Sequence, residues 1–243
     1  MYLIRSNYSN NSLALVQWAH EQGLKNVTVC YVDTGWAAEG WLDYVAKCEA
    51  YVAQLGFRVK HLKSRMPFAE LMNVKNGFPS ARFQWCSLHL KGISLLQWLE
   101  EVDPEEQTQV LIAKRRVEHG EGIPEFIDCC EFHGDRKVWH PLVDCSDSER
   151  DALISRTGFP LLSTLSKECA PCINSRVTDL RQLSALDIEK TEELEEDLET
   201  PMFNPEQRGN IENIIDVVAW SKQVDDDTLN PAFGCSFSFG CGV

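Results

Sequence analysis

The sequence predicts an α/β fold in which a mostly parallel five-stranded sheet is covered by helices on both faces. Two observations lead to this class. Short apolar and β-branched runs alternate with segments whose apolar residues recur at helical spacing. Residues 27–32 form a β-branched, largely apolar run of the kind that is buried on both faces of a sheet. Strands that alternate with helices of this length indicate a parallel arrangement.

Five segments have the pattern of strands, and three clear helices accompany them. The strands are expected at residues 2–5, 27–32, 58–62, 109–113 and 137–142. The helices are expected at residues 12–22, 38–55 and 147–157, with Asn11 or Ser12 as the N-cap of the first. Ligands of such sheets bind beyond the carboxyl ends of the strands. The turns after the first, second and fourth strands are therefore the expected site.

The pattern changes after the last predicted strand, which divides the chain into a sheet domain at residues 1–160 and a helical, cysteine-rich region at residues 161–243. This second region has an acidic helical stretch that ends near Leu198. Two prolines and a glycine within residues 200–209 indicate a linker, and a short amphipathic helix is expected at residues 211–220.

Composition and charge argue against two classes of protein, general nucleic-acid coats and membrane-spanning proteins. The 243 residues carry a formal net charge of −14, with a sequence pI of about 4.8, which argues against a general nucleic-acid coat because phosphate backbones need a basic surface. No apolar run approaches the roughly 20 residues that span a bilayer. The first residues resemble a strand rather than a secretory signal. We therefore expect a cytoplasmic protein with no membrane partner.

Ten cysteines are many for such a protein, because stable disulfides are rare in the cytoplasm. Cys169 and Cys172 form one close pair, and Cys235 and Cys241 form another. Two such pairs on tight loops can supply a four-thiolate site for zinc or for an iron–sulfur cluster. A redox pair is the alternative, although a thioredoxin-like context is missing. Small buried hydrophobic roles are expected for three others, Cys30, Cys48 and Cys145.

The first turn resembles a known phosphate-binding loop. PP-loop ATP pyrophosphatases place a Ser-Gly-Gly-x-Asp-Ser loop between the first strand and helix, where backbone N–H groups hold nucleotide phosphates. Residues 7–12 occupy the matching place, and Ser12 keeps the final hydroxyl, whereas both glycines and the acidic residue are replaced. The resemblance implies that nucleotide phosphate lies against Ser9, Asn10, Asn11 and Ser12.

Four further segments follow in the order of that family. Residues 32–35 resemble its acidic strand-end motif, residues 83–91 its W-C-x-x-x-L-K segment, residues 114–118 its G-x-R-x-x-E motif and residues 139–142 its x-x-P-L strand. The chain is thus similar to the branch of PP-loop proteins that contains phosphoadenosine-phosphosulfate (PAPS) reductase. The resemblance covers residues 1–160 well and the cysteine region more loosely.

The resemblance implies that ATP with Mg²⁺, or an adenylated sulfur compound, binds across the strand ends. Asp33 would organise the nucleotide and Mg²⁺ together with Ser12, and Thr34 and Gly35 would contact the nucleotide from the same turn. The cations placed near phosphate or sulfate are Lys91, Arg115 and Arg116, of which the two arginines suit bidentate contact with oxyanions. Asp33, Lys91 and Arg116 are the expected catalytic residues. His89 stays undecided, and His140 is expected to be structural.

Several sulfur-handling relatives carry a 4Fe–4S cluster, and this favours iron–sulfur over zinc. Cys86 matches a position that ligates the cluster in some relatives, so it could replace one tail cysteine. If all four cysteines bound the cluster, no iron would remain open to bind sulfur. Either one cysteine is therefore not a ligand, or the cluster has a structural or electron-transfer role.

Three functions follow from the resemblance. The first is an adenylating or sulfurtransferase-type enzyme that moves sulfur from a donor to a nucleic acid or a small molecule. The alternative is a catalytically degenerate nucleotide- or partner-binding protein with structural zinc. Reduction of PAPS or its unphosphorylated analogue APS to sulfite is less favoured, because the Glu-Cys-Gly tail of such reductases is missing. Homodimers are common among relatives.

Overall fold

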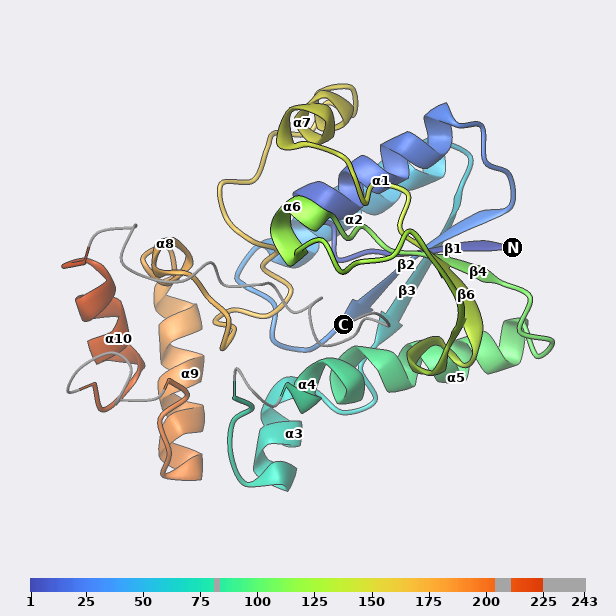
Figure 1. The fold of residues 1–243 in the computed structure, drawn as a ribbon. Coiled ribbons are helices and arrows are strands. Elements are labelled where there is room, and N and C mark those ends of the chain that lie inside the picture. The colour runs from blue at the N-terminus through green and yellow to red at the C-terminus, as the bar shows by residue number, and fades with distance from the viewer. Residues whose placement is uncertain (81–83, 204–210, 225–243) are drawn as a thin grey trace.

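A computed structural model describes residues 1–80, 84–203 and 211–224. Its centre is a six-stranded sheet in the order β3-β2-β1-β4-β6-β5 (Figure 1). All neighbouring strands are parallel except β5 and β6. The predicted α/β class is confirmed. The strands are β1 (Tyr2–Arg5), β2 (Val27–Asp33), β3 (Arg58–Lys63), β4 (Gln109–Leu111), β5 (Phe126–Cys130) and β6 (Arg136–Trp139).

The prediction of five strands was wrong by one, because β5 was missed. This strand lies at the edge of the sheet, antiparallel to β6, and only Cys130 among its five residues is buried. An edge strand with mostly exposed residues has no apolar run to reveal it. Its Phe126 ring stacks on Trp139 with 5.5 Å between the ring centroids.

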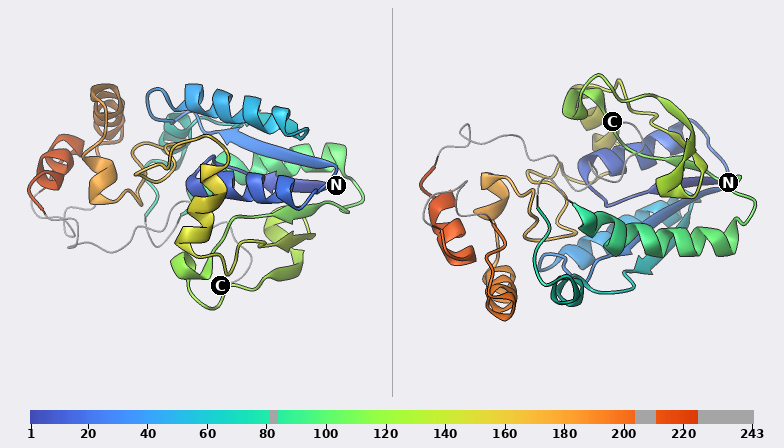
Figure 2. Two further views of the ribbon diagram at one scale, coloured as in Figure 1. Left: turned by 90° about the horizontal axis from the view of Figure 1, so that it is seen from above. Right: turned by 60° about the horizontal axis from the view of Figure 1, so that its bottom comes forward.

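Helices cover both faces of the sheet (Figure 2). The helices of the sheet domain are α1 (Asn10–Glu21), α2 (Trp41–Gln54), α3 (Phe68–Lys75), α4 (Trp85–Ser87), α5 (Ile93–Val102), α6 (Arg116–His119) and α7 (Asp147–Ser155). Alternating residues of one strand point to opposite faces. Val29 and Tyr31 of β2 therefore join the core under α1, α2 and α7, whereas Cys30 and Val32 join the core under α5.

Helix α1 begins two residues earlier than expected. The N-cap is Ser9, not Asn11 or Ser12, because the extended backbone of Ser9 lets its hydroxyl accept a hydrogen bond from the Ser12 N–H group. Ser12 is consequently a buried residue inside the first turn of the helix.

The C-terminal helices α8 (Val177–Leu180), α9 (Ala185–Leu198) and α10 (Ile214–Ser221) lie to one side of the sheet (Figure 1). They share a hydrophobic core with α3 and with the segment around Trp36, so they pack directly on the sheet domain. The boundary predicted at residue 160 stays a prediction. Of the predicted linker, residues 204–210 lie outside the described part of the chain.

Glu195 of α9 ties this helix to the two segments that follow it. Its carboxylate accepts hydrogen bonds from the backbone N–H groups of Met202 at 2.8 Å and Ile214 at 2.7 Å. The side chain is buried, and burial raises the pKa of Glu195 although both N–H groups oppose that shift. One buried carboxylate thus satisfies two buried amide groups. No helix within the described ranges is long and apolar enough to cross a membrane.

Candidate functional site

A polar cavity of about 70 Å³ lies at the carboxyl ends of β1, β2 and β4. The order of the strands reverses between β1 and β4, and such a switch point is where open α/β sheets bind ligands. Residues 7–12, which form the turn before α1 and the start of that helix and are called the α1 loop below, supply Asn7, Ser9, Asn11 and Ser12 to the wall. The opposite side includes Lys91 and Glu168. The cavity therefore forms where the sequence places the phosphate-binding loop.

The loop is held by its own side chains. The Asn7 amide oxygen accepts hydrogen bonds from the Ser9 N–H group at 3.2 Å and from the Ser12 hydroxyl at 3.1 Å. This short network fixes the turn without the glycines of the family motif. It leaves the start of α1 directed at the cavity, where N–H groups favour anions.

The two asparagines of the loop bind distant parts of the chain. Asn10 exchanges two hydrogen bonds of 2.9 Å with the backbone of Leu162. Asn11 donates to Glu118 at 2.6 Å, and its own carbonyl oxygen is buried without a partner in the described residues. Both side chains position α1, which sequence reasoning did not foresee.

The predicted turn after β2 is built around Gly35. Asp33 lies half-buried at the strand end, and its carboxylate accepts a hydrogen bond of 2.9 Å from the Gly35 N–H group. The Thr34 hydroxyl is fully buried and donates to the Glu168 carbonyl oxygen at 2.7 Å. The turn thus joins the sheet to the segment that carries Cys169.

Gly35→Ala is expected to be clearly more destabilising than Gly23→Ala. Both glycines have left-handed φ angles, +68° and +67°, so alanine strains both by about 1 kcal/mol. A Cβ at Gly35 would also lie 2.9 Å from the Cβ of Pro67, whereas Gly23 has open space. This overlap adds about 1–3 kcal/mol. Urea denaturation of the two variants checks the difference, and equal losses would contradict the close contact.

Lys91 and Glu168 form a buried ion pair of 2.8 Å, with side-chain exposures of 8% and 4%. Lys91 lies on η1, the π-helical turn Leu88–Gly92 before α5, and such turns are frequent at functional sites. The Asn7 amide group lies 3.4 Å from the same carboxylate. Lys91 was predicted for the site. Glu168 was not, although it follows a lysine and precedes the cysteine pair.

The two predicted arginines do not line the cavity. Arg115 is fully buried, and its guanidinium pairs with Glu118 and with Asp147, the latter at 2.7 Å. Arg116 is partly exposed and pairs with Asp144. Because Glu118 also accepts the hydrogen bond from Asn11, Arg115 reaches the α1 loop through one carboxylate.

Three of the predicted cysteines come together. Cys86, Cys169 and Cys172 line a second small cavity of about 10 Å³, roughly enough for one water molecule, and Lys91 lines it as well. Cys235 and Cys241 lie outside the described residues. Within residues 1–80, 84–203 and 211–224, no three His, Cys, Asp or Glu side chains are grouped closely enough to hold one metal ion.

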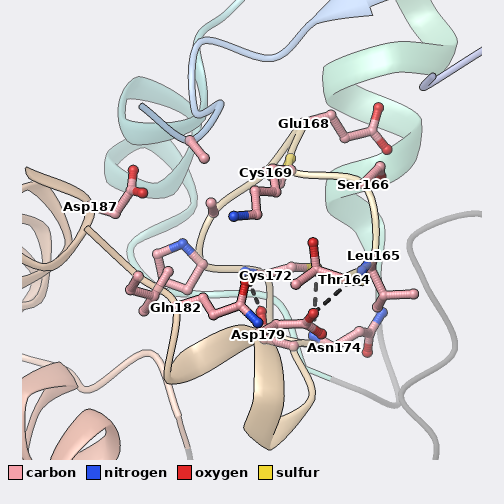
Figure 3. A pocket seen from close by; sticks show the side chains of 16 residues that line it. Thr164, Leu165, Ser166, Glu168, Cys169, Cys172, Asn174, Asp179, Gln182 and Asp187 are labelled. Atoms are coloured by element: carbon pink, nitrogen blue, oxygen red, sulfur yellow. Dashed lines mark hydrogen bonds between the residues drawn. The ribbon is translucent and has the colours of Figure 1, made fainter. Parts of the chain in front are cut away.

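The loop of Cys169 and Cys172 is attached to the end of β2. Cys169 pairs with Trp36 in a short parallel bridge, and the Trp36 indole donates to the Pro171 carbonyl oxygen at 3.2 Å. Figure 3 shows the pocket that this loop forms with α8 and the start of α9, whose lining includes Cys169, Cys172, Asp179 and Asp187. The cysteine pair is thus open to this pocket as well as to the small cavity.

The expected core role is confirmed for Cys30 and Cys48. Both are buried, and burial raises the pKa of each thiol to about 12, which keeps it protonated and unreactive. Cys145 is half-buried. His89 contacts Trp85 edge-on at 6.2 Å, and burial together with Lys75 lowers its pKa.

No family model matches the sequence, and no curated protein matches it either. Solved structures do resemble it. They include PAPS reductase from Candida auris in complex with phosphate, with 14% identity over 66% of this chain and 74% of that one and a TM-score of 0.47. The PAPS reductase belongs to the group of proteins that the sequence resembles.

Two further similar structures are a synthetase and an adenylyltransferase. NMN synthetase from Francisella tularensis has 11% identity over 91% of this chain and 84% of that one, with a TM-score of 0.48. FMN adenylyltransferase from Candida glabrata, in complex with FMN and an ATP analogue, has 11% identity over 66% of this chain and 50% of that one, with a TM-score of 0.42. At these identities the similarity concerns the fold and not the ligand.

Proposed function

We propose that the chain binds an adenine nucleotide at the carboxyl ends of β1, β2 and β4 and adenylates a second substrate beside a cysteine site. One observation carries this proposal. Lys91 lines both the polar cavity at the strand ends and the small cavity of Cys86, Cys169 and Cys172. A nucleotide in the first cavity would therefore lie within one side chain of the thiols.

Each part of the strand-end cavity has a role in this proposal. The N–H groups at the start of α1 and the Ser9 and Ser12 hydroxyls would hold phosphate oxygens. Asp33 does not line the cavity itself. Its carboxylate, in the neighbouring turn at the end of β2, would hold Mg²⁺. Lys91 would face the phosphates from the opposite wall, with Glu168 fixing its ammonium group. Arg115 would act as a positioning residue, because it holds the Glu118 carboxylate that anchors Asn11.

The proposed reaction is transfer of AMP. A carbonyl oxygen of the second substrate attacks the α-phosphorus of ATP, and the bond from that phosphorus to the bridging oxygen breaks, so pyrophosphate leaves. Hydrosulfide, supplied by the sulfur donor, then attacks the activated carbon. AMP leaves with the former carbonyl oxygen, and loss of the S–H proton leaves a thiocarbonyl group. The substrate class is a nucleic-acid base or a small molecule with a carbonyl group.

Thiolates are the donors that iron–sulfur clusters and zinc prefer. Cys86, Cys169 and Cys172 have the right chemistry, but the described residues alone do not form a ligand set. A cluster bound there would supply electron transfer or sulfur binding. We assign no step of the reaction to it.

A nucleotide- or partner-binding protein with structural zinc is the second candidate. The observation that favours it is the loop of residues 7–12, in which Asn7, Ser9 and Ser12 bind one another. Two of the loop residues, Asn10 and Asn11, are also committed to distant segments. Such a loop could bind a nucleotide without assisting its cleavage.

Metal analysis, a visible spectrum and pyrophosphate release on anaerobically purified protein test the proposal. We expect about four irons per chain and a broad band near ~400 nm, together with pyrophosphate release from ATP and Mg²⁺. Cys169→Ala should lose the metal, and the exposed Cys129→Ala should keep it. Asp33→Asn should keep the metal and lose pyrophosphate release. Intact metal and ATP binding without pyrophosphate release would favour the binding protein.

A further inference from the structure

Three neighbouring parallel strands lead into basic residues at one end of the sheet. Arg5 is the last residue of β1, Lys114 follows β4 by three positions and His140 comes directly after β6. Arg5, Ile112 and Ala113 line the strand-end cavity. Lys114 is therefore the next residue in the chain after Ala113 of that wall.

Lys114 is buried, and the described part of the chain provides no counter-ion for it. Its exposed fraction is 2%, and no carboxylate of the described residues forms an ion pair with it. Burial, followed by the charge of Arg5, lowers the pKa of Lys114 to about 8. A buried lysine is normally paired, because an isolated ammonium group loses its hydration on burial. An anion bound here would supply the partner that the described residues lack.

His140 offers an unused hydrogen-bonding atom in the same region. The side chain is fully buried, and its Nδ1 lies 2.7 Å from the Pro124 carbonyl oxygen, so Nδ1 carries a proton and donates it. Its Nε2 is buried with no partner among the described residues. The Ile112 N–H group donates to the Trp139 carbonyl oxygen at 3.0 Å, so the segments that carry Lys114 and His140 run side by side. Burial lowers the pKa of His140, and the charge of Lys114 lowers it further, which favours the neutral ring. Nε2 is then an acceptor.

We propose that Lys114 and His140, with Arg5 beside them, form a subsite for hydrogenphosphate. The ammonium and guanidinium groups supply positive charge for a tetrahedral oxyanion. Nε2 of His140 accepts a hydrogen bond from the P–OH group that hydrogenphosphate carries and sulfate lacks at neutral pH. The position of this subsite beside a nucleotide rests on the proposed function. Binding of phosphate to the subsite does not require a nucleotide.

Inorganic phosphate is the probe, measured by calorimetry and thermal unfolding in chloride buffer at constant ionic strength. Lys114→Met keeps the length of the side chain and removes its charge, and Lys47→Met on the exposed side of α2 is the matched control. We expect wild type and Lys47→Met to bind phosphate equally, and Lys114→Met to bind it at least about tenfold more weakly.

Two further readouts separate this subsite from a structural role. Without phosphate, Lys114→Met should be at least as stable as wild type, because it removes an unpaired buried charge. His140→Asn keeps a donor for Pro124 but lacks Nε2, so the preference for phosphate over sulfate should disappear. Unchanged phosphate affinity in Lys114→Met, or equal binding of sulfate and phosphate by wild type, would overturn the assignment.

Titration of the same preparations with ATP and AMP distinguishes this inference from the proposed function. If ATP binds but inorganic phosphate does not, the phosphate subsite is wrong and the nucleotide site stands. If phosphate binds in the Lys114-dependent way but neither nucleotide does, the subsite stands and the nucleotide site is wrong. Competition between phosphate and ATP would place the two groups in one pocket.

Discussion

Lys91→Met is expected to lower the free energy of unfolding by about 3–5 kcal/mol, the usual cost of removing one partner of a buried ion pair. The Glu168 carboxylate would stay buried, with the Asn7 amide at 3.4 Å as its remaining side-chain contact. Glu168 also precedes Cys169, and its backbone carbonyl accepts from Thr34. The loss should therefore loosen the cysteine loop as well as η1.

Two comparisons define this effect. Arg156→Met breaks the exposed pair between Arg156 and Glu21, whose side chains are 47% and 33% exposed, and should cost less than about 1 kcal/mol. The double variant Lys91→Met with Glu168→Met replaces both charges by apolar groups and should recover much of the lost stability. Chemical denaturation of all four proteins measures the differences. Equal losses for Lys91→Met and Arg156→Met would show that the buried pair does not matter for stability.

Glu195→Ala is expected to speed hydrogen exchange at the backbone amides of Met202 and Ile214 by roughly a hundredfold or more. Each of these amides donates to the Glu195 carboxylate, and leaving a buried donor without an acceptor costs about 1–3 kcal/mol. The free energy of local opening should fall by about 3 kcal/mol, whereas amides in β1 and β2 should be unaffected.

Glu193→Ala is the matched control, because Glu193 lies on the same helix and is exposed. It should leave exchange at both amides unchanged. Glu195→Gln keeps one acceptor oxygen and should give an intermediate rate. Exchange that is equally fast in wild type and Glu195→Ala would mean that α9 is not tied to the following segments through this carboxylate.

The parts of the fold that could be predicted are those whose own residues bury a continuous surface. The apolar run of β2 needs no knowledge of its neighbours, since it is buried on both faces. Strand β5 is different, because its pairing depends on β6 and on the stacking of Phe126 on Trp139. The start of α1 was misplaced because several serines and asparagines there could serve as caps, and only the backbone shows that Ser9 does.

The candidate site could be predicted where a residue type has one dominant chemistry. Cys169 and Cys172 stood out by spacing, and Cys86 by resemblance, and all three line one cavity. The partners of the charged residues could not be predicted. Glu168 meets Lys91 across 77 positions of sequence. Sequence alone therefore gave no reason to expect that pair.

The two predicted arginines also show that the partners of charged residues could not be predicted from the sequence. Arg115 and Arg116 were expected near phosphate because of the family resemblance and because arginine suits bidentate contact with oxyanions. Nothing in the sequence shows which acidic residues will meet them. The fold brings Glu118 and Asp147 to one and Asp144 to the other. Their charges are thereby neutralised within the protein.

The composition of β3 is relevant to how copies of this protein avoid aggregation through their sheet edges. Among the described residues β3 pairs only with β2, so within this part of the chain its other side is an edge of the sheet. That edge carries Arg58, Lys60 and Lys63 in a strand of six residues, although the chain as a whole is strongly negative. Two such edges would bring like charges together on contact, which opposes the strand-to-strand growth that leads to aggregates. A symmetric dimer of this protein would have to use another face.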